Sequence, residues 1–198
     1  MLNVSRVLAC ATAAIATAGL AIAQSAEASG PRGPVPGKPG DQNIVEIALA
    51  VNAESGEFSY LLAAATCKYF DGAVVDLLTG SDRYTLFAPT DEAFAALQTE
   101  LGIEEPSPEL TCTLDRATLF DVLAYHVTDG RRFSNSVFNR NAVKMVEMLN
   151  GQYVITNPDL TLNDIAGQSV GVVPTLVNIN ASNGVIHVID TVLLPFKP

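Results

Sequence analysis

The chain has 198 residues, of which 48% are hydrophobic, and its formal net charge is −10. This length is enough for one domain of ordinary size together with a leader and a linker. The negative charge would repel phosphate backbones and anionic membrane surfaces, and the sequence has no tryptophan on which bases could stack. We therefore expect no nucleic-acid partner, whereas multivalent cations, basic proteins and neutral polymers stay open.

The N-terminal region has the features of a secretory signal peptide. Arg6 precedes an uncharged, alanine-rich run from Val7 to Ala23, and Ala21-Ile22-Ala23 matches the small-x-small pattern that signal peptidase needs. We predict that residues 1–23 are a signal peptide, with Ala26-Glu27-Ala28 as a second candidate cleavage site. The alternative is an uncleaved anchor, but a run of about 17 residues made mostly of alanine is short for a membrane span. The mature chain is then expected to be secreted, periplasmic or at the cell surface, with no transmembrane segment.

Residues 24–40 are rich in proline, glycine and small residues. Such a segment buries almost no apolar surface and cannot offset the entropy of ordering, while its prolines keep it extended. We interpret it as a linker and predict a single domain over residues 41–198.

The first part of this domain has the patterns of helices. Asn43 and Glu46 form a plausible capping pair, and Thr90 can cap the helix that follows Pro89. Helices are predicted after Asn43, over Phe58–Lys68, over Ala73–Leu78, after Thr90 and over Leu114–Tyr125. A short strand, Tyr84–Ala88, ends at Pro89.

The C-terminal part has the patterns of strands. Asn150-Gly151 and Asn183-Gly184 each lie between apolar runs, and Asn-Gly is the preferred turn of a two-residue β-hairpin. The predicted strands are Met145–Leu149, Tyr153–Thr156, Leu160–Leu162, Val170–Val173, Val177–Ala181 and Val185–Ile189. Because helices come first and strands later, the sequence predicts an α+β fold without alternating βαβ units.

The cysteines fit an exported protein. Cys10 lies in the leader and is expected to leave with it, so that Cys67 and Cys112 remain as an even pair. Disulfides persist in oxidising compartments, and we therefore predict a Cys67–Cys112 bridge. Two buried free thiols are the alternative.

Three stretches in order resemble the signature segments of the fasciclin family. They are TLFAPTDEAF (85–94), LAYHV (123–127) and NGVIHVIDTVLLP (183–195). The residues that carry the resemblance are Thr85, Phe87, Pro89, Thr90, Tyr125, His126, Asn183, Gly184, His187 and Asp190. The resemblance implies a wedge of β-strands with small flanking helices, a role in adhesion or in matrix or biofilm association, no enzymatic activity and no cofactor.

The motifs also have structural interpretations of their own. The first is a strand, a proline stop, a cap and an amphipathic helix, and the last contains a strand that is apolar on both faces and must be central. In animal matrix members of the family, an Asp-Ile dipeptide before the last motif has been linked to integrin recognition. The matching residues here are Asn178-Ile179, which lack the carboxylate, so integrin binding is not expected.

The residue pattern does not favour a catalytic or metal site. His126 and His187 are the only histidines, and each fits a hydrogen-bonded structural residue better than a zinc ligand. The polar segment Asn157–Asp164 lacks the spacing of a calcium loop, so we interpret it as a turn.

We rank three functional hypotheses. The first is an exported binding module that mediates adhesion by contacting an extracellular protein or polysaccharide, with Asp129, Arg131 and Arg132 as the candidate binding surface. The second is an extracytoplasmic carrier or receptor for a small apolar or polymeric ligand, bound in a cleft between helices and sheet. The third, ranked last, is a hydrolase.

Overall fold

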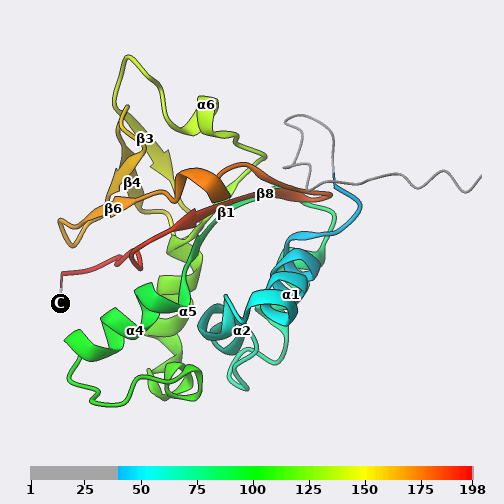
Figure 1. Ribbon diagram of the computed structural model, residues 1–198, viewed down its shortest axis with the longest axis vertical. Helices are drawn as coiled ribbons and strands as arrows, with labels where there is room; N and C mark the ends of the chain where they lie inside the picture. The colour runs from blue at the N-terminus through cyan, green and yellow to red at the C-terminus, as the bar shows by residue number, and fades with distance from the viewer. Residues whose placement is uncertain (1–39, 198) are drawn as a thin grey trace, which may run out of the picture. The chain divides into compact units, whose positions relative to one another are not determined.

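The computed structural model describes residues 40–197. The predicted signal peptide, 1–23, and all but the last residue of the predicted linker, 24–40, lie outside the described residues. The described part is an α+β domain in which a helical layer, a first sheet and a second sheet follow one another (Figure 1). The predicted α+β fold class is therefore confirmed.

The first helix forms where its capping residues predict it. Helix α1 (Ile44–Ser55) begins after Asn43, whose side chain accepts a hydrogen bond from the backbone N–H of Glu46 at 2.9 Å. The Glu46 carboxylate in turn accepts the backbone N–H of Asn43 at 2.8 Å, which completes a capping box. Helix α1 ends at Gly56, which takes a left-handed conformation with φ of 79°.

Two short helices follow. Helix α2 (Ser59–Ala65) is shorter at both ends than the predicted Phe58–Lys68, because Phe58 has a left-handed backbone, with φ of 67°, and Thr66 is the C-cap. Helix α3 (Ala73–Thr79) agrees with its prediction to within one residue. The Asp91 carboxylate accepts the backbone N–H groups of Ser59 and Tyr60 at 3.1 and 3.2 Å, so it caps α2 from outside.

Strand β1 (Tyr84–Pro89) and helix α4 (Asp91–Glu100) form where the sequence predicts them. The Thr90 hydroxyl accepts the backbone N–H of Ala93 at 3.2 Å and caps α4. The polar loop that follows contains a 3-10 helix, η1 (Pro108–Thr113), that was not predicted. Helix α5 (Arg116–Tyr125) begins two residues later than predicted, because Asp115 caps it by accepting two backbone N–H groups.

The first sheet has the strand order β2-β1-β8-β7. Strands β1 and β8 (Gly184–Ile189) are parallel, central and buried along their whole length, as predicted for the last motif. Strand β7 (Ile179–Ala181) pairs antiparallel with β8. On the other side, β2 (Val127–Asp129), which was not predicted, pairs antiparallel with β1.

The second sheet is an antiparallel meander with the order β3-β4-β5-β6. Its strands are β3 (Lys144–Glu147), β4 (Tyr153–Thr156), β5 (Thr161–Asn163) and β6 (Ser169–Gly171). The short helix α6 (Ser134–Val137) precedes this sheet, and a 3-10 turn, η2 (Pro174–Leu176), follows it; neither was predicted. The segment Asn157–Asp164, interpreted as a polar turn, forms the β4–β5 turn and strand β5.

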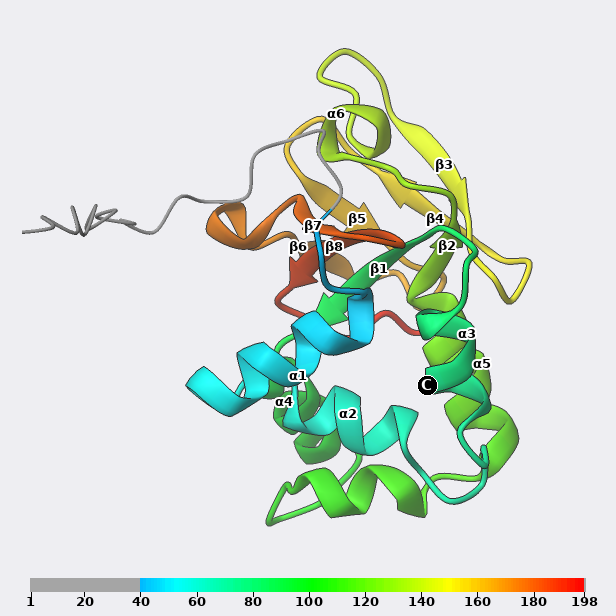
Figure 2. The ribbon, with the colours of Figure 1, turned by 90° about the vertical axis from the view of Figure 1, so that its right-hand side faces the viewer.

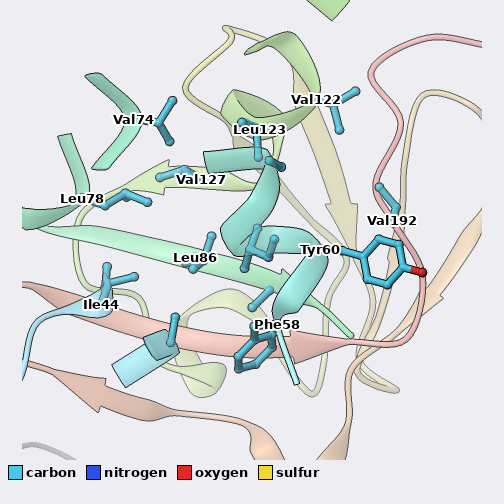
Figure 3. Close-up of a cluster of buried hydrophobic side chains, with 14 of the residues drawn as sticks. Ile44, Phe58, Tyr60, Val74, Leu78, Leu86, Val122, Leu123, Val127 and Val192 are labelled. Atoms are coloured by element: carbon cyan, nitrogen blue, oxygen red, sulfur yellow. The ribbon is translucent and has the colours of Figure 1, made fainter. Parts of the chain in front are cut away.

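The core has two parts, one on each face of the first sheet. Alternate residues of the central strands, such as Leu86 and Ile186, pack against the helices (Figure 3). Phe87 and Ile189 face the other way and pack against the inner face of the second sheet. Figure 2 shows the second sheet on one side of β1 and β8 and helices α1 to α5 on the other. This layering leaves one face of the second sheet open to solvent.

The sequence predicts that both Asn-Gly segments form hairpin turns with positive φ. The structure differs from this prediction in both places. Gly151 has a φ of 81°, but Asn150 does not take the left-handed conformation. Gly184 has no positive φ and is the first residue of β8, so that Ser182 and Asn183 form the loop. A Cβ atom on Gly184 would overlap the Tyr84 carbonyl oxygen and lie 2.6 Å from Ile44 Cδ1. Glycine is therefore needed at this position for close packing.

Candidate functional site

His187 lies on β8, between the two sheets, and is fully buried. Its Nδ1 accepts the backbone N–H of Asn178 at 3.3 Å, so Nε2 carries the proton and donates it to the Arg132 carbonyl oxygen at 2.8 Å. The ring stacks on Phe87, with 5.7 Å between centroids. Burial lowers the pKa of His187 and keeps it neutral.

His126 lies at the C-terminal end of α5, at the predicted helix-to-strand junction, and is also buried. Its Nε2 accepts the backbone N–H of Leu193 at 3.0 Å, so Nδ1 donates to the Val122 carbonyl oxygen at 2.7 Å. Burial lowers the pKa of His126 to about 4. Both rings thus bond only to backbone groups, and residues 40–197 contain no cluster of acidic, histidine or cysteine side chains that could hold a metal.

Other motif residues connect elements that are distant in sequence. The buried Thr85 hydroxyl donates to the Gly130 carbonyl oxygen at 2.7 Å. The Tyr125 hydroxyl donates to the Tyr153 carbonyl oxygen at 2.9 Å and accepts the backbone N–H of Ile165 at 3.3 Å. Burial raises the pKa of Tyr125 to about 12, so this donor is protonated at any physiological pH.

Asp190 and Asn183 have the same connecting role at the two ends of β8. Asp190 accepts the backbone N–H of Gly171, at the end of β6, at 2.9 Å. Asn183 is buried, accepts the backbone N–H of Ile44 at 3.0 Å and donates to the Leu78 carbonyl oxygen at 2.5 Å. It therefore joins the start of α1 and the end of α3 to the first sheet, a role that goes beyond the turn predicted for it.

The segment Asp129–Arg132, predicted as a binding surface, is less exposed than expected. Asp129 is exposed, but Arg131 and Arg132 are half-buried. Arg131 donates to the Asn180 side chain, and Arg132 Nε donates to the Asp129 carbonyl oxygen at 2.8 Å. Burial and the nearby charge of Arg83 lower the pKa of Arg131.

Asn178, at the position of the family's acidic residue, is a structural residue in this chain. It has a left-handed backbone with φ of 61°, a conformation that asparagine tolerates better than most residues. Its side chain accepts the backbone N–H of Ser134 at 2.6 Å and donates to the Ser134 hydroxyl at 2.8 Å. The side chain thus ties the start of α6 to β7.

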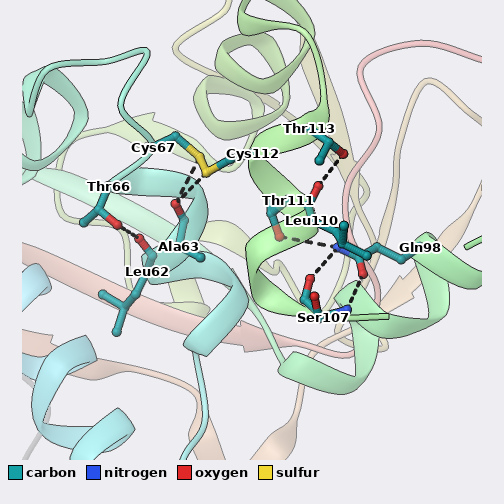
Figure 4. The surroundings of a disulfide bond; sticks show 10 residues. All are labelled: Leu62, Ala63, Thr66, Cys67, Gln98, Ser107, Leu110, Thr111, Cys112 and Thr113. Carbon is teal, nitrogen blue, oxygen red and sulfur yellow. Dashed lines mark hydrogen bonds between the residues drawn. A yellow bond between two sulfur atoms is a disulfide. The ribbon is translucent and has the colours of Figure 1, made fainter. Parts of the chain in front are cut away.

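Cys67 and Cys112 are joined by a disulfide between the end of α2 and η1, with Cα atoms 5.7 Å apart (Figure 4). Both sulfur atoms lie close to the carbonyl oxygen of Ala63, at 3.1 and 3.5 Å. The bridge attaches η1 to the helical layer, as predicted for the loop that contains Cys112.

The outer face of the second sheet carries an apolar patch that sequence analysis did not identify. Met145 on β3 lies opposite Ile155 on β4, and both point away from the core. Met145 is 67% exposed, Tyr153 45% and Ile155 39%, and the exposed Ile165 borders the same shallow hollow. We call Met145, Tyr153, Ile155 and Ile165 the outer patch. The alternation of β3 and β4 was the signal that could have indicated it.

Comparison with known proteins agrees with these observations. The family model of the fasciclin domain matches residues 59–195. The chain belongs to the fasciclin family. Fasciclin domains are known in cell-adhesion proteins and are non-enzymatic modules.

The similar proteins differ in how much of their own length this chain matches. The uncharacterized protein sll1735 of Synechocystis is 33% identical over 77% of this chain and 97% of its own length. Human periostin is 27% identical over 80% of this chain, which spans only 16% of periostin. A FAS1 domain pair from the insect cell adhesion molecule Fasciclin I matches 68% of this chain and 43% of its own, with a TM-score of 0.47 and 20% identity. Within residues 40–197, no helix is long and apolar enough to cross a membrane.

Proposed function

We propose that this fasciclin domain is an exported adhesion module that binds an extracellular protein through the outer patch. The observation that carries the proposal is the pairing of Met145 with Ile155, beside Tyr153, on a strand face that no element of residues 40–197 covers. Contiguous exposed apolar side chains on a folded domain are typical of interaction sites. Tyrosine and methionine are also enriched in protein interfaces.

The charges of the molecule favour a basic partner. The chain carries a formal net charge of −10, and the exposed Glu147 lies opposite Tyr153, beside the outer patch. The nearest lysine on β3, Lys144, donates to the Ser136 carbonyl oxygen at 2.7 Å. A protein surface that combines apolar side chains with lysine or arginine would therefore match the outer patch in both respects.

The experiment compares the wild-type full chain with two variants, each of which replaces one exposed apolar residue by aspartate. Met145→Asp places a carboxylate in the outer patch, and Leu77→Asp is the control, because Leu77 is exposed on α3, outside the outer patch. Each immobilised protein is exposed to an envelope extract, and retained proteins are quantified. The proposal requires a basic protein retained by wild type and Leu77→Asp but reduced about tenfold or more with Met145→Asp. Equal retention by all three, or retention of only a polysaccharide, would overturn it.

Export is part of the same proposal, and it rests on the leader. The expected mature N-terminus is Gln24, after cleavage at Ala23. Intact-mass measurement of the exported protein checks this directly. A mass that still contains residues 1–23 would favour an anchored protein.

A further inference from the structure

The helical layer contains a second candidate binding region, which is independent of the outer patch. A pocket lies between α4, η1, α5 and the C-terminal segment, with walls formed largely by Phe94, Leu97, Leu110, Leu119, Val122 and Phe196. These residues come from segments that are far apart in the sequence and converge only in the fold.

The size of this pocket fits a small organic molecule. Its volume is about 340 Å³, within the range of roughly 300–1,000 Å³ that is typical of ligand sites. At roughly 30 Å³ for each liquid water, it has room for a ligand of about ten to fifteen non-hydrogen atoms. A second apolar cavity, between α1, α2, α3 and β1, has a volume of about 150 Å³ and is too small for such a ligand.

Two polar side chains in the wall, Gln98 and Thr113, are occupied by intramolecular hydrogen bonds, and the Glu100 carboxylate also lines the pocket. The buried Gln98 side chain donates to the Ser107 carbonyl oxygen at 3.0 Å and accepts the Ser107 backbone N–H at 2.8 Å (Figure 4). The Thr113 hydroxyl donates to the Leu110 carbonyl oxygen at 2.6 Å. A ligand donor or acceptor placed beside Gln98 or Thr113 would lose its bonds to water without finding replacements there.

The disulfide keeps this pocket in shape. Cys112 lies between Thr111 and Thr113, which both line the pocket, and its bond to Cys67 fixes η1 against α2. A wall that is already held in place loses little conformational entropy when a ligand binds, which raises affinity.

We propose that this pocket binds a small, uncharged molecule that is apolar throughout, such as a terpene-like or aromatic hydrocarbon. The pocket selects its ligand through a largely apolar wall, in which the Gln98 and Thr113 side chains are already hydrogen-bonded within the protein and the Glu100 carboxylate would repel an anion. Ligand binding here does not depend on the adhesive contacts of the outer patch.

The experiment is a fluorescence titration of the full chain with naphthalene as the dye, a fluorescent hydrocarbon that has no hydrogen-bonding group and is small enough for this volume. Leu101 lines the pocket at the end of α4 and is 53% exposed, so Leu101→Asp puts a charge at the mouth with little effect on the core. Leu77→Asp is the matched control, because Leu77 is 41% exposed and lies outside this pocket. We expect Leu101→Asp to weaken dye binding roughly tenfold to hundredfold and Leu77→Asp to leave it within about twofold.

Further variants separate this proposal from the previous one. Phe196→Asp is a second test of the pocket should Leu101→Asp fail to fold, and we expect the same loss of dye affinity. Met145→Asp should leave dye binding unchanged, and reduction of the disulfide should weaken it. No dye binding to wild type, or equal binding by wild type and both pocket variants, would overturn the pocket proposal and leave the adhesion proposal untouched.

Discussion

Replacement of Asn183 by alanine should destabilise the domain more than its place in a hairpin loop suggests. The side chain is buried and bonds to Ile44 in α1 and to Leu78 in α3, which are 139 and 105 residues away along the chain. The alanine variant removes both hydrogen bonds and leaves a backbone N–H and a carbonyl oxygen without partners in a buried place. Each lost bond costs about 0.5–1.5 kcal/mol, and each unsatisfied group adds to this, so we expect a loss of about 2–4 kcal/mol.

Urea unfolding followed by circular dichroism measures this effect. The midpoint should fall while the slope with denaturant stays the same, because the change removes contacts without altering the compactness of either state. For a domain of this size, the melting temperature should fall by roughly 4–16 °C. Asn52→Ala is the control, since the Asn52 side chain also makes several hydrogen bonds, but only to Gly56, Glu57 and Ser59, which are close in sequence and near the surface.

Melting temperatures of the Asn183→Ala and Asn52→Ala variants within about 2 °C of each other would contradict this prediction. Such a result would mean that water replaces the Asn183 side chain at the ends of both helices. The loop would then be an ordinary turn, as its sequence alone suggests.

Acid should weaken the fold through the two buried histidines. Their pKa values are lowered in the folded protein, so their contribution to stability is complete above about pH 6.5 and is lost as the pH falls and the unfolded chain takes up protons. Between pH 6.5 and 4, protonation linked to His126 alone should lower the unfolding free energy by about 3 kcal/mol. Urea unfolding of His126→Gln should show a weaker pH dependence of stability than wild type. An unchanged pH dependence would contradict the structural role of His126. Reduction of the Cys67–Cys112 bridge, whose cysteines are 45 residues apart in the sequence, should lower the unfolding free energy by up to about 4 kcal/mol. Titration of free thiols in unfolded, unreduced protein tests the bridge itself. Two or more reactive thiols would show that the bridge does not form. Charge reversal of the exposed Asp129 should weaken retention of the adhesion partner by about threefold to tenfold at low salt, and unchanged retention would remove the Asp129–Arg132 segment from the binding surface.

The sequence by itself determined the features that depend on neighbouring residues. The capping box of Asn43 and Glu46, the Thr90 cap and the burial of β8 along its whole length could be predicted because helix ends and fully apolar strands leave local patterns. The α+β class and the family followed from the order of these patterns and from three motifs. In each case the signal lies within a short run of neighbouring residues, as a capping pair or an uninterrupted apolar segment.

Only the tertiary structure decided the features that depend on distant pairs. Strand β2 has three residues and forms because β1 is available to pair with it, as in the contact of Asp129 with Tyr84. Gly184 is required by the approach of the Tyr84 carbonyl, and no local turn rule contains that information. The alternation of β3 and β4 gives two faces, but which face becomes the exposed outer patch is set by packing against β1 and β8. The physical reason is that burial and strand pairing are properties of surfaces brought together by the whole chain, whereas capping and periodicity act within single turns.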